Sequence, residues 1–226
     1  MVSRLAKEMY YGVFRIPMRL NGWLYRCFRQ PASNIKVHLG CGQKNYLSGW
    51  VNVDANIITA RIDLWANLSD PLPFRSESVA AFYSFHVIEH LPDSFLPKHF
   101  GAMFRALAPG GRIRIGGPHG GNACQKYIEG DREWFGSYPD DRLSVGGRMA
   151  NFILCRGEHL TILTEDYLRE LAEAAGFSEI SFWSPMHSEN FGVEVLAVEH
   201  ESDPLFPHSV IMEAIRPASG FSRDRS

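Results

Sequence analysis

The sequence of 226 residues has no long apolar run, no clustered cysteines and no large excess of either charge. No stretch of about 18 apolar residues occurs, so no transmembrane helix is predicted. Arg15, Pro17 and Arg19 interrupt the apolar residues near the N-terminus, which argues against a secretory signal. The four cysteines are widely spaced and form no CxxC pair, so we expect free thiols in a reducing cytoplasm rather than disulfides or a zinc knuckle.

The balanced charge and ordinary composition exclude further classes of protein. Lys and Arg total 23 against 25 Asp and Glu, a formal net charge of -2, which gives no indication of a nucleic-acid partner. Apolar residues make up 45% and charged residues 21%, as in globular proteins. We predict a main domain over residues 35–200 with an irregular insertion at 118–160, followed by a partly disordered tail at 201–226.

Residues 1–34 differ from the rest of the chain in charge. Six basic residues and one acidic residue give this segment a net charge of +5, and aromatic residues lie among them. This composition allows two interpretations of the segment. It makes peripheral contact with an anionic membrane surface, or it is a lid that closes over the main domain. Pro17 and Asn21-Gly22 predict that the segment is not one continuous helix.

From residue 35 onward, short apolar runs alternate with helical periodicity, which predicts an α/β fold with a mostly parallel sheet. The expected helices begin near residues 97 and 165, and Gly176 fits the end of the second. The insertion at 118–160 shows no sustained period and is interpreted as a lid or binding loop. Strands are expected over residues 35–39, 50–54, 61–65, 79–84, 112–116, 180–183 and 193–198.

The strongest motif is Gly40-Cys41-Gly42 at the end of the first expected strand, with Asp54 at the end of the second. Glycine lets the backbone approach a ligand closely, and a carboxylate at Asp54 is placed to accept hydrogen bonds from a ribose diol. The dinucleotide pattern GxGxxG is not met because Asn45 occupies the third glycine position, and the phosphate-binding pattern GxxxxGK[ST] is absent. The motif therefore predicts a ribose-containing ligand without a required pyrophosphate.

Five motifs in order carry a family resemblance: VHLGCG at 37–42, GWVNVD at 49–54, PLPF at 71–74, SFHVIEHL at 84–91 and LAPGG at 107–111. The sequence resembles the class I S-adenosylmethionine-dependent methyltransferases, and within them a small type-11-like branch associated with glycan and cell-surface pathways. The resemblance covers residues 35–117 and 158–199. It implies a Rossmann-like, doubly wound sheet that is mostly parallel with an antiparallel last strand, and S-adenosylmethionine as the cofactor.

The resemblance also implies roles for individual residues. Gly40 and Gly42 would lie under the methionine portion of the cofactor, and Asp54 would hold the ribose hydroxyls. Asn67 and Leu68 stand where relatives place an Asp-Leu pair beside the adenine, with Asp63 or Asp70 as substitutes for the missing carboxylate. The other residues expected to line the cofactor are His38, Cys41, Ser84, Phe85 and His86.

The segment from His86 to His90 also matches HxxEH, a signature of zinc peptidases. That site needs both histidines on one face of a continuing helix, so that they meet the same ion. Pro92 follows after two residues and leaves room for about one helical turn. We therefore predict no metal site here, and capping and packing roles for Glu89 and His90.

Methyl transfer to a hydroxyl needs a base, and the candidates are His86, His119 and His159 because histidine titrates near neutral pH. Tyr127, Asp131 and Trp134 in the insertion are candidate acceptor contacts. The favoured function is O-methylation of a sugar or glycan precursor, in the cytoplasm and in peripheral contact with a membrane through residues 1–34. The alternatives are methylation of a quinol or natural product, or a non-catalytic cofactor-binding partner subunit.

Overall fold

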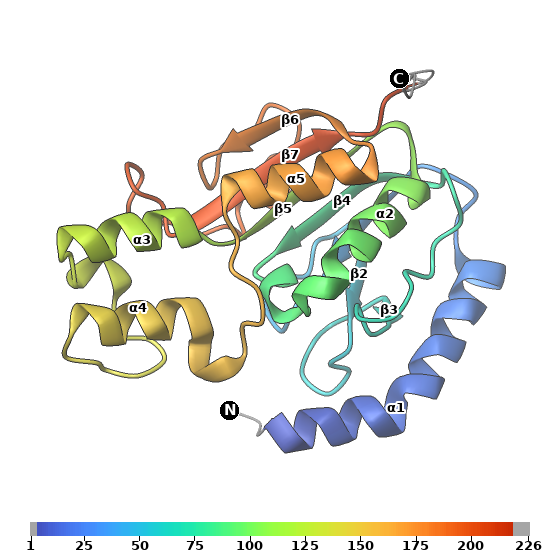
Figure 1. Cartoon of the computed structure of the whole chain (residues 1–226). Coiled ribbons are helices and arrows are strands. Elements are labelled where there is room, and N and C mark those ends of the chain that lie inside the picture. The colour runs from blue at the N-terminus through green and yellow to red at the C-terminus, as the bar shows by residue number, and fades with distance from the viewer. Residues whose placement is uncertain (1–3, 219–226) are drawn as a thin grey trace.

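The computed structural model describes residues 4–218, so the disorder expected at the end of the tail, over residues 219–226, lies outside the described residues. Seven strands form one sheet in the order β3-β2-β1-β4-β5-β7-β6 (Figure 1). Neighbours among β1 to β5 are parallel, and β7 is antiparallel to both β5 and β6. The predicted architecture is thus confirmed. The strands are β1 (Ile35–Leu39), β2 (Val51–Asp54), β3 (Leu64–Trp65), β4 (Val79–Phe85), β5 (Leu107–Pro118), β6 (Ser178–Trp183) and β7 (Ser209–Ile215).

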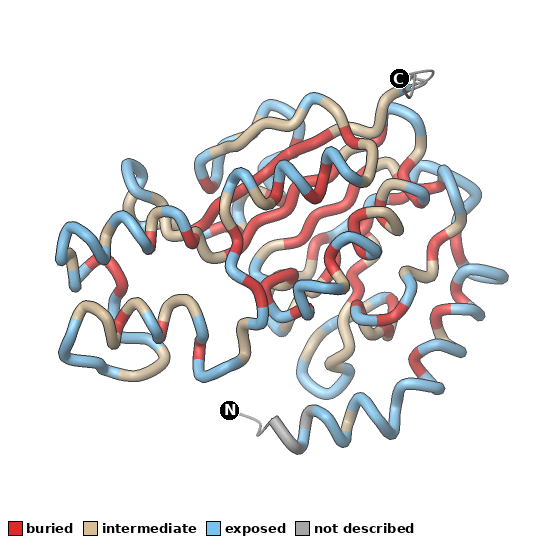
Figure 2. The backbone as a smooth tube through the Cα atoms, in the orientation of Figure 1, coloured by how far each residue is buried: buried red, intermediate tan, exposed pale blue. Residues whose placement is uncertain are grey.

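Helices cover the face of the sheet that carries the main core. Figure 1 shows α2 and α5 lying across the front of the strands, and Figure 2 shows those strands buried along most of their length. Val37 and Leu39 point to this face, while His38 between them points to the other, as the two-residue period of a strand requires. The helices are α1 (Arg4–Leu24), α2 (Leu96–Ala106), α3 (Gly120–Glu129), α4 (Val145–Leu154), α5 (Glu165–Ala175) and α6 (Val193–Leu196), with a π-helical turn η1 (Tyr25–Arg29) and 3-10 turns η2 (Ile88–His90), η3 (Asp93–Phe95), η4 (Glu133–Phe135) and η5 (Cys155–Gly157).

The last strand differs from the prediction. The expected strand over 193–198 is wrong, because α6 lies there, and β7 comes from the segment predicted to be a tail. Glu213 interrupts the apolar pattern of β7, but its carboxylate lies 2.6 Å from Nη1 of the fully buried Arg114 on β5. Glu199 binds the same guanidinium through both carboxylate oxygens at 2.7 Å. The main domain therefore continues beyond residue 200, and a buried ion cluster joins its last strand to the sheet.

The insertion at 118–160 is helical rather than irregular, because α3 and α4 fall within it. These helices lie beside the sheet in Figure 1 and carry a small core of their own around Trp134, Phe135 and Ala123. That core explains the scattered aromatic residues of this segment. Helices as short as α3 and α4 are stabilised mainly by tertiary packing, which the local sequence pattern does not show.

Helix α1 is continuous through Pro17, so the prediction that the N-terminal segment is broken is also wrong. Figure 1 shows α1 changing direction about midway, as a proline inside a helix causes. Its inner face binds the domain through Met18, which is 1% exposed, and through a hydrogen bond from the Tyr10 hydroxyl to the Ala55 carbonyl at 2.6 Å. None of the described helices is both long and apolar enough to cross a bilayer.

Candidate functional site

A cavity of about 490 Å³ lies at the carboxyl ends of the central parallel strands. Its walls come from the loops after β1, β2, β3 and β4, from the N-terminal half of α1 and from residues 157–160. Strand β1 pairs with β2 on one side and β4 on the other, so the connections leave in opposite directions here, where open α/β sheets bind ligands. Six residues predicted from the sequence line the cavity, namely Gly40, Gly42, Asp54, Asn67, Leu68 and His86.

Gly40 lets the loop after β1 lie directly against the loop after β4. Its φ is +71°, and a Cβ added there would stand 2.3 Å from Cγ2 of Val87. Its backbone N–H donates to the Val53 carbonyl at 2.8 Å, which ties the loop to β2. Only glycine satisfies both the backbone conformation and the close approach.

The backbone fixes the carboxylate of Asp54. The Gly42 N–H donates to Oδ2 at 2.9 Å, and the Asn56 N–H donates to Oδ1 at 2.8 Å. Each carboxylate oxygen can accept a second hydrogen bond, so the group keeps capacity for a diol. Gly42 itself has φ +57° and no atom within 4 Å of an added Cβ, which leaves open space beside Asp54.

Four of the residues predicted to bind a cofactor do not line this cavity. His38 is buried on the opposite face of the sheet, 3.3 Å from Oδ1 of Asn52, and burial lowers the pKa of its imidazole to about 4. Cys41 is fully buried, and burial raises the pKa of its thiol to about 12. Ser84 is buried and Phe85 packs against the core of the second face.

The cavity wall includes Asn67 but neither Asp63 nor Asp70. The Ser69 N–H donates to Oδ1 of Asn67 at 2.9 Å, which fixes the amide. Asp63 accepts hydrogen bonds from the backbone and side chain of Asn52, both at 2.9 Å. Asp70 is buried and binds two arginines of α1. Both carboxylates thus serve the structure, outside the cavity wall.

His86 presents its ring to the cavity from an unusual backbone position. Its φ is +55°, an uncommon conformation for a residue with a side chain, and its N–H donates to the Gly116 carbonyl at 2.9 Å. The Nδ1 atom lies 3.3 Å from Oε1 of Glu89, and Nε2 lies 3.2 Å from the Ser209 hydroxyl. His86 thus lines the cavity with both ring nitrogens close to neighbouring side chains.

The other two predicted bases lie in different places. His159 is half buried, its Nδ1 lies 3.0 Å from the Ile153 carbonyl, and burial lowers its pKa. Its neighbours Glu158 and Leu160 line the cavity with His86. His119 instead accepts a hydrogen bond from the Asn122 N–H at the start of α3 and faces a separate cavity of about 850 Å³ beside α5. The structure therefore groups His86 with His159 and separates His119 from both.

Sequence reasoning missed the positions of Glu8, Tyr11 and Glu89. Glu8 and Tyr11 on α1 line the cavity, which no local motif could indicate. Glu89 is 1% exposed and lies between histidines. In the sequence, only the HxxEH pattern indicates a functional role for Glu89. Because Pro92 limits the helix there to about one turn, the sequence predicts a capping role for Glu89.

Comparison with solved structures identifies the class of fold. A SAM-dependent methyltransferase from Archaeoglobus fulgidus superimposes with a TM-score of 0.53 at 16% identity, covering 91% of this chain and 99% of that one. An S-adenosylmethionine-dependent methyltransferase from Mesorhizobium loti gives a TM-score of 0.50 at 17% identity, with 90% and 97% covered. Phosphoethanolamine N-methyltransferase 2 of Haemonchus contortus, in complex with S-adenosyl-L-methionine, gives 0.50 at 14% identity over 95% of this chain.

The chain spans only 57% of the length of the Haemonchus contortus protein. No family model matches the sequence, and no match is found among curated proteins. The strand order and the structural neighbours together show the class I methyltransferase fold.

Replacing Gly40 by alanine should test the close approach of the two loops. We expect Gly40→Ala to lower the free energy of unfolding by about 2–5 kcal/mol, from ~1–2 kcal/mol of backbone strain and ~1–3 kcal/mol of overpacking against Val87. Gly42→Ala, which has strain but no clash, should lose only the first part. Urea denaturation of both variants measures the difference. Equal losses of stability in the two variants would contradict the close contact between Gly40 and Val87. The double variant Gly40→Ala, Val87→Ala should regain the part of the free energy of unfolding that overpacking removes.

Proposed function

We propose that the protein is an S-adenosylmethionine-dependent methyltransferase that methylates a hydroxyl group of a sugar or glycan precursor. The observation that carries this proposal is the meeting of Gly40, Asp54 and His86 in one cavity at the carboxyl edge of the sheet. The class I methyltransferase fold supports it, and so do the five ordered motifs.

The cavity fits the proposed cofactor by its chemistry. Asp54 has free acceptor capacity for the ribose hydroxyls, and the open space at Gly42 admits the methionine portion. Asn67 and Leu68 form the wall for the adenine, with the Asn67 amide oriented by Ser69. When bound, S-adenosylmethionine supplies a methyl group on a positively charged sulfur.

His86 supports an oxygen as the methylated atom. A hydroxyl must lose its proton as the new bond forms, and the His86 imidazole faces the cavity to accept it. The Glu89 carboxylate lies 3.3 Å from Nδ1 of this ring. The sugar or glycan nature of the acceptor is inferred from the resemblance of the motifs.

Calorimetric titration tests the class of enzyme first. The protein should bind S-adenosylmethionine and not NAD, and incubation with a panel of hydroxyl and amine acceptors should then give a mass gain on a hydroxyl compound. Binding of NAD alone would contradict the proposal. A mass gain only on amines would keep the methyltransferase and reject the hydroxyl acceptor.

Asp54→Ala should weaken cofactor binding strongly. Hydrogen bonds to a charged group contribute about 1.5–3 kcal/mol each, so loss of two should lower the affinity for S-adenosylmethionine by more than ~100-fold. Calorimetry measures the affinity, and an unchanged melting temperature shows that the fold is kept. Asp63→Ala is the matched control, because that carboxylate lies outside the cavity. If Asp54→Ala binds as tightly as the parent, the cofactor site lies elsewhere.

His86→Ala should reduce the rate of methyl transfer by about 100- to 10,000-fold while the affinity for S-adenosylmethionine changes little. The rate is measured with the acceptor that the mass screen identifies. His119→Ala should have a smaller effect because His119 faces the other cavity. Equal losses of binding and rate in His86→Ala would make His86 a packing residue of the cavity.

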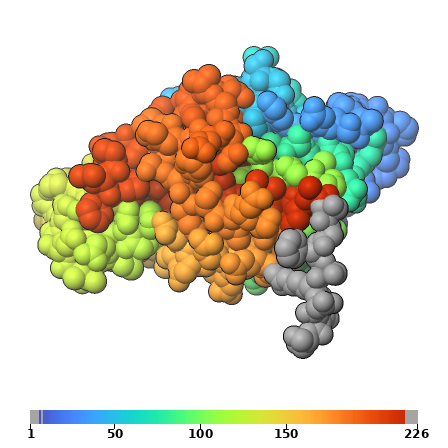
Figure 3. Space-filling view, turned by 90° about the horizontal axis from the view of Figure 1, so that it is seen from above, coloured from blue at the N-terminus to red at the C-terminus, as the bar shows by residue number. Residues whose placement is uncertain are grey.

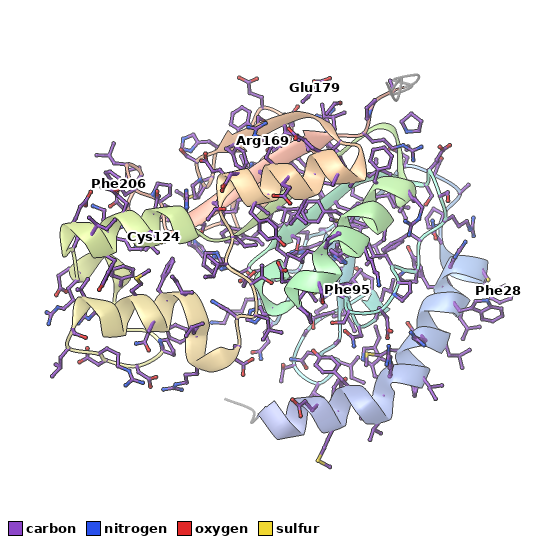
Figure 4. All side chains as sticks on the ribbon, in the orientation of Figure 1. Phe28, Phe95, Cys124, Arg169, Glu179 and Phe206 are labelled. Atoms are coloured by element: carbon purple, nitrogen blue, oxygen red, sulfur yellow. The ribbon has the colours of Figure 1, made fainter. Side chains whose placement is uncertain are left out.

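We further propose that α1 binds the surface of an anionic membrane. Its outer face carries a continuous stripe of exposed apolar side chains, opposite the face that packs on the domain. Phe28, just beyond α1, points away from the domain (Figure 4) and is 74% exposed. The basic charge of residues 1–34 favours anionic lipid, and Tyr11 places α1 in the wall of the cavity that His86 also lines. The stripe consists of Met9, Val13, Ile16, Leu20 and Trp23, from 54% to 78% exposed.

The double substitution Ile16→Asp and Leu20→Asp should abolish co-sedimentation of the full chain with phosphatidylglycerol vesicles, because it places charge in the middle of the stripe. Leu205→Asp is the matched control, since Leu205 is 86% exposed on a different surface and should leave pelleting unchanged. Equal pelleting of all three proteins, or none, contradicts the proposal. A change in oligomeric state without a change in pelleting would assign the stripe to a second copy of the chain.

A further inference from the structure

Three metal-ligating side chains from two distant segments meet beside the cavity. Glu89 and His90 belong to η2 after β4, and His159 follows η5 at the end of the insertion, with one ligand atom of each within 4.8 Å of the others. The backbone holds the segments together, because the N–H groups of Leu160 and Thr161 both donate to the Glu89 carbonyl, at 2.7 and 3.2 Å. The sequence predicts no metal site because His86 and His90 lie on too short a helix. In the structure the second histidine of the cluster is His159, from the end of the insertion.

Both histidines are oriented as metal ligands are. Nδ1 of His90 lies 2.9 Å from the Glu158 carbonyl, and Nδ1 of His159 lies 3.0 Å from the Ile153 carbonyl. A carbonyl only accepts, so each neutral ring carries its proton on Nδ1 and keeps a free lone pair on Nε2. Metal-binding histidines typically donate their other ring N–H in this way.

Glu89 provides a second and independent observation. Its side chain is 1% exposed, and neither carboxylate oxygen has a hydrogen-bond partner within residues 4–218. The nearest basic nitrogens are Nδ1 of His86 at 3.3 Å and Nε2 of His90 at 3.9 Å. A buried carboxylate without a partner is unfavourable, and a cation between these groups would supply the missing interaction.

We propose that Glu89, His90 and His159 bind one divalent transition-metal cation at the edge of the cavity. Two imidazoles and one carboxylate form a ligand set for zinc, iron or manganese that leaves coordination positions open. The ligand atoms need to move inward by less than ~1 Å to reach bond lengths of about 2.0–2.2 Å. The site borders the cavity, because His90 and the neighbouring Glu158 and Leu160 line it.

A role for the cation in catalysis rests on the proposed function, whereas the binding site does not. A hydroxyl oxygen bound to a divalent cation loses its proton more readily. In the proposed reaction His86 would take that proton, and the oxygen would gain the methyl group as the carbon–sulfur bond of the cofactor breaks.

Calorimetric titration of the chelator-treated full chain with Zn²⁺ alone tests the site. The protein should bind one equivalent of Zn²⁺. Glu89→Gln and His159→Gln should each lower the affinity for Zn²⁺ by more than ~100-fold, which exceeds the ~10–100-fold effect of losing a residue that only hydrogen-bonds to a metal ligand. His187→Gln and Glu194→Gln are matched controls on exposed positions and should bind as the parent does. Absence of stoichiometric binding, or equal binding by all variants, overturns the proposal.

Thermal melting separates a metal ligand from a structural residue. Zn²⁺ should raise the melting temperature of the parent and not that of Glu89→Gln. Metal-free Glu89→Gln should melt no lower than the metal-free parent, because the substitution removes a buried carboxylate that lacks a partner. A lower melting temperature of this variant assigns Glu89 a structural role and overturns the proposal.

Titration of the same preparation with S-adenosylmethionine distinguishes the two proposals. Binding of Zn²⁺ without S-adenosylmethionine would overturn the proposed function and keep the metal site. Binding of S-adenosylmethionine without Zn²⁺ would overturn the metal site alone.

Discussion

The junction between the loop after β4 and residues 157–161 is the contact on which the candidate site depends. The Glu89 carbonyl accepts two N–H groups from this segment, and the Thr161 hydroxyl donates to the Leu91 carbonyl at 2.9 Å. These hydrogen bonds return the chain from the insertion to the edge of the sheet. Without them the cavity would lose one wall, and His159 would not meet His90. The same junction buries the Glu89 carboxylate, to which the proposed cation would bind.

The site lies between two parts of the chain that are far apart in sequence. Figure 3 shows the N-terminal segment, in blue, and the first part of the insertion, in yellow-green, at opposite ends of the molecule. Helix α1 contributes Glu8 and Tyr11 to the cavity, and the end of the insertion contributes Glu158 and Leu160. An acceptor would thus meet a wall from a surface helix on one side and from the insertion on the other. This arrangement agrees with the proposal that α1 faces a lipid surface from which the acceptor comes.

The predicted residues that line the cavity include those whose positions follow from one strand and its end. Gly40, Gly42 and Asp54 each stand just beyond or at the end of a strand, so parallel pairing alone brings them to one edge. His38 lies on β1, two residues before Gly40, yet the two-residue period of the strand turns it to the opposite face of the sheet. The expected strand over 193–198 failed because apolar alternation alone does not select a partner strand. Segment 209–215 occupies that place in the sheet, with Glu213 bound to Arg114.

The sequence by itself determined the class of fold, the strand ends that form the cavity and the glycine that keeps two loops in contact, because these depend on local patterns and backbone conformation. Tertiary structure alone decided the path of α1, the position of the last strand and which residues lie next to Glu89. Each of these depends on contacts between segments separated by tens of residues. The HxxEH motif illustrates the difference. Pro92 leaves its helix too short for His86 and His90 to bind one ion, whereas folding brings His159, 69 residues beyond His90, beside the same carboxylate.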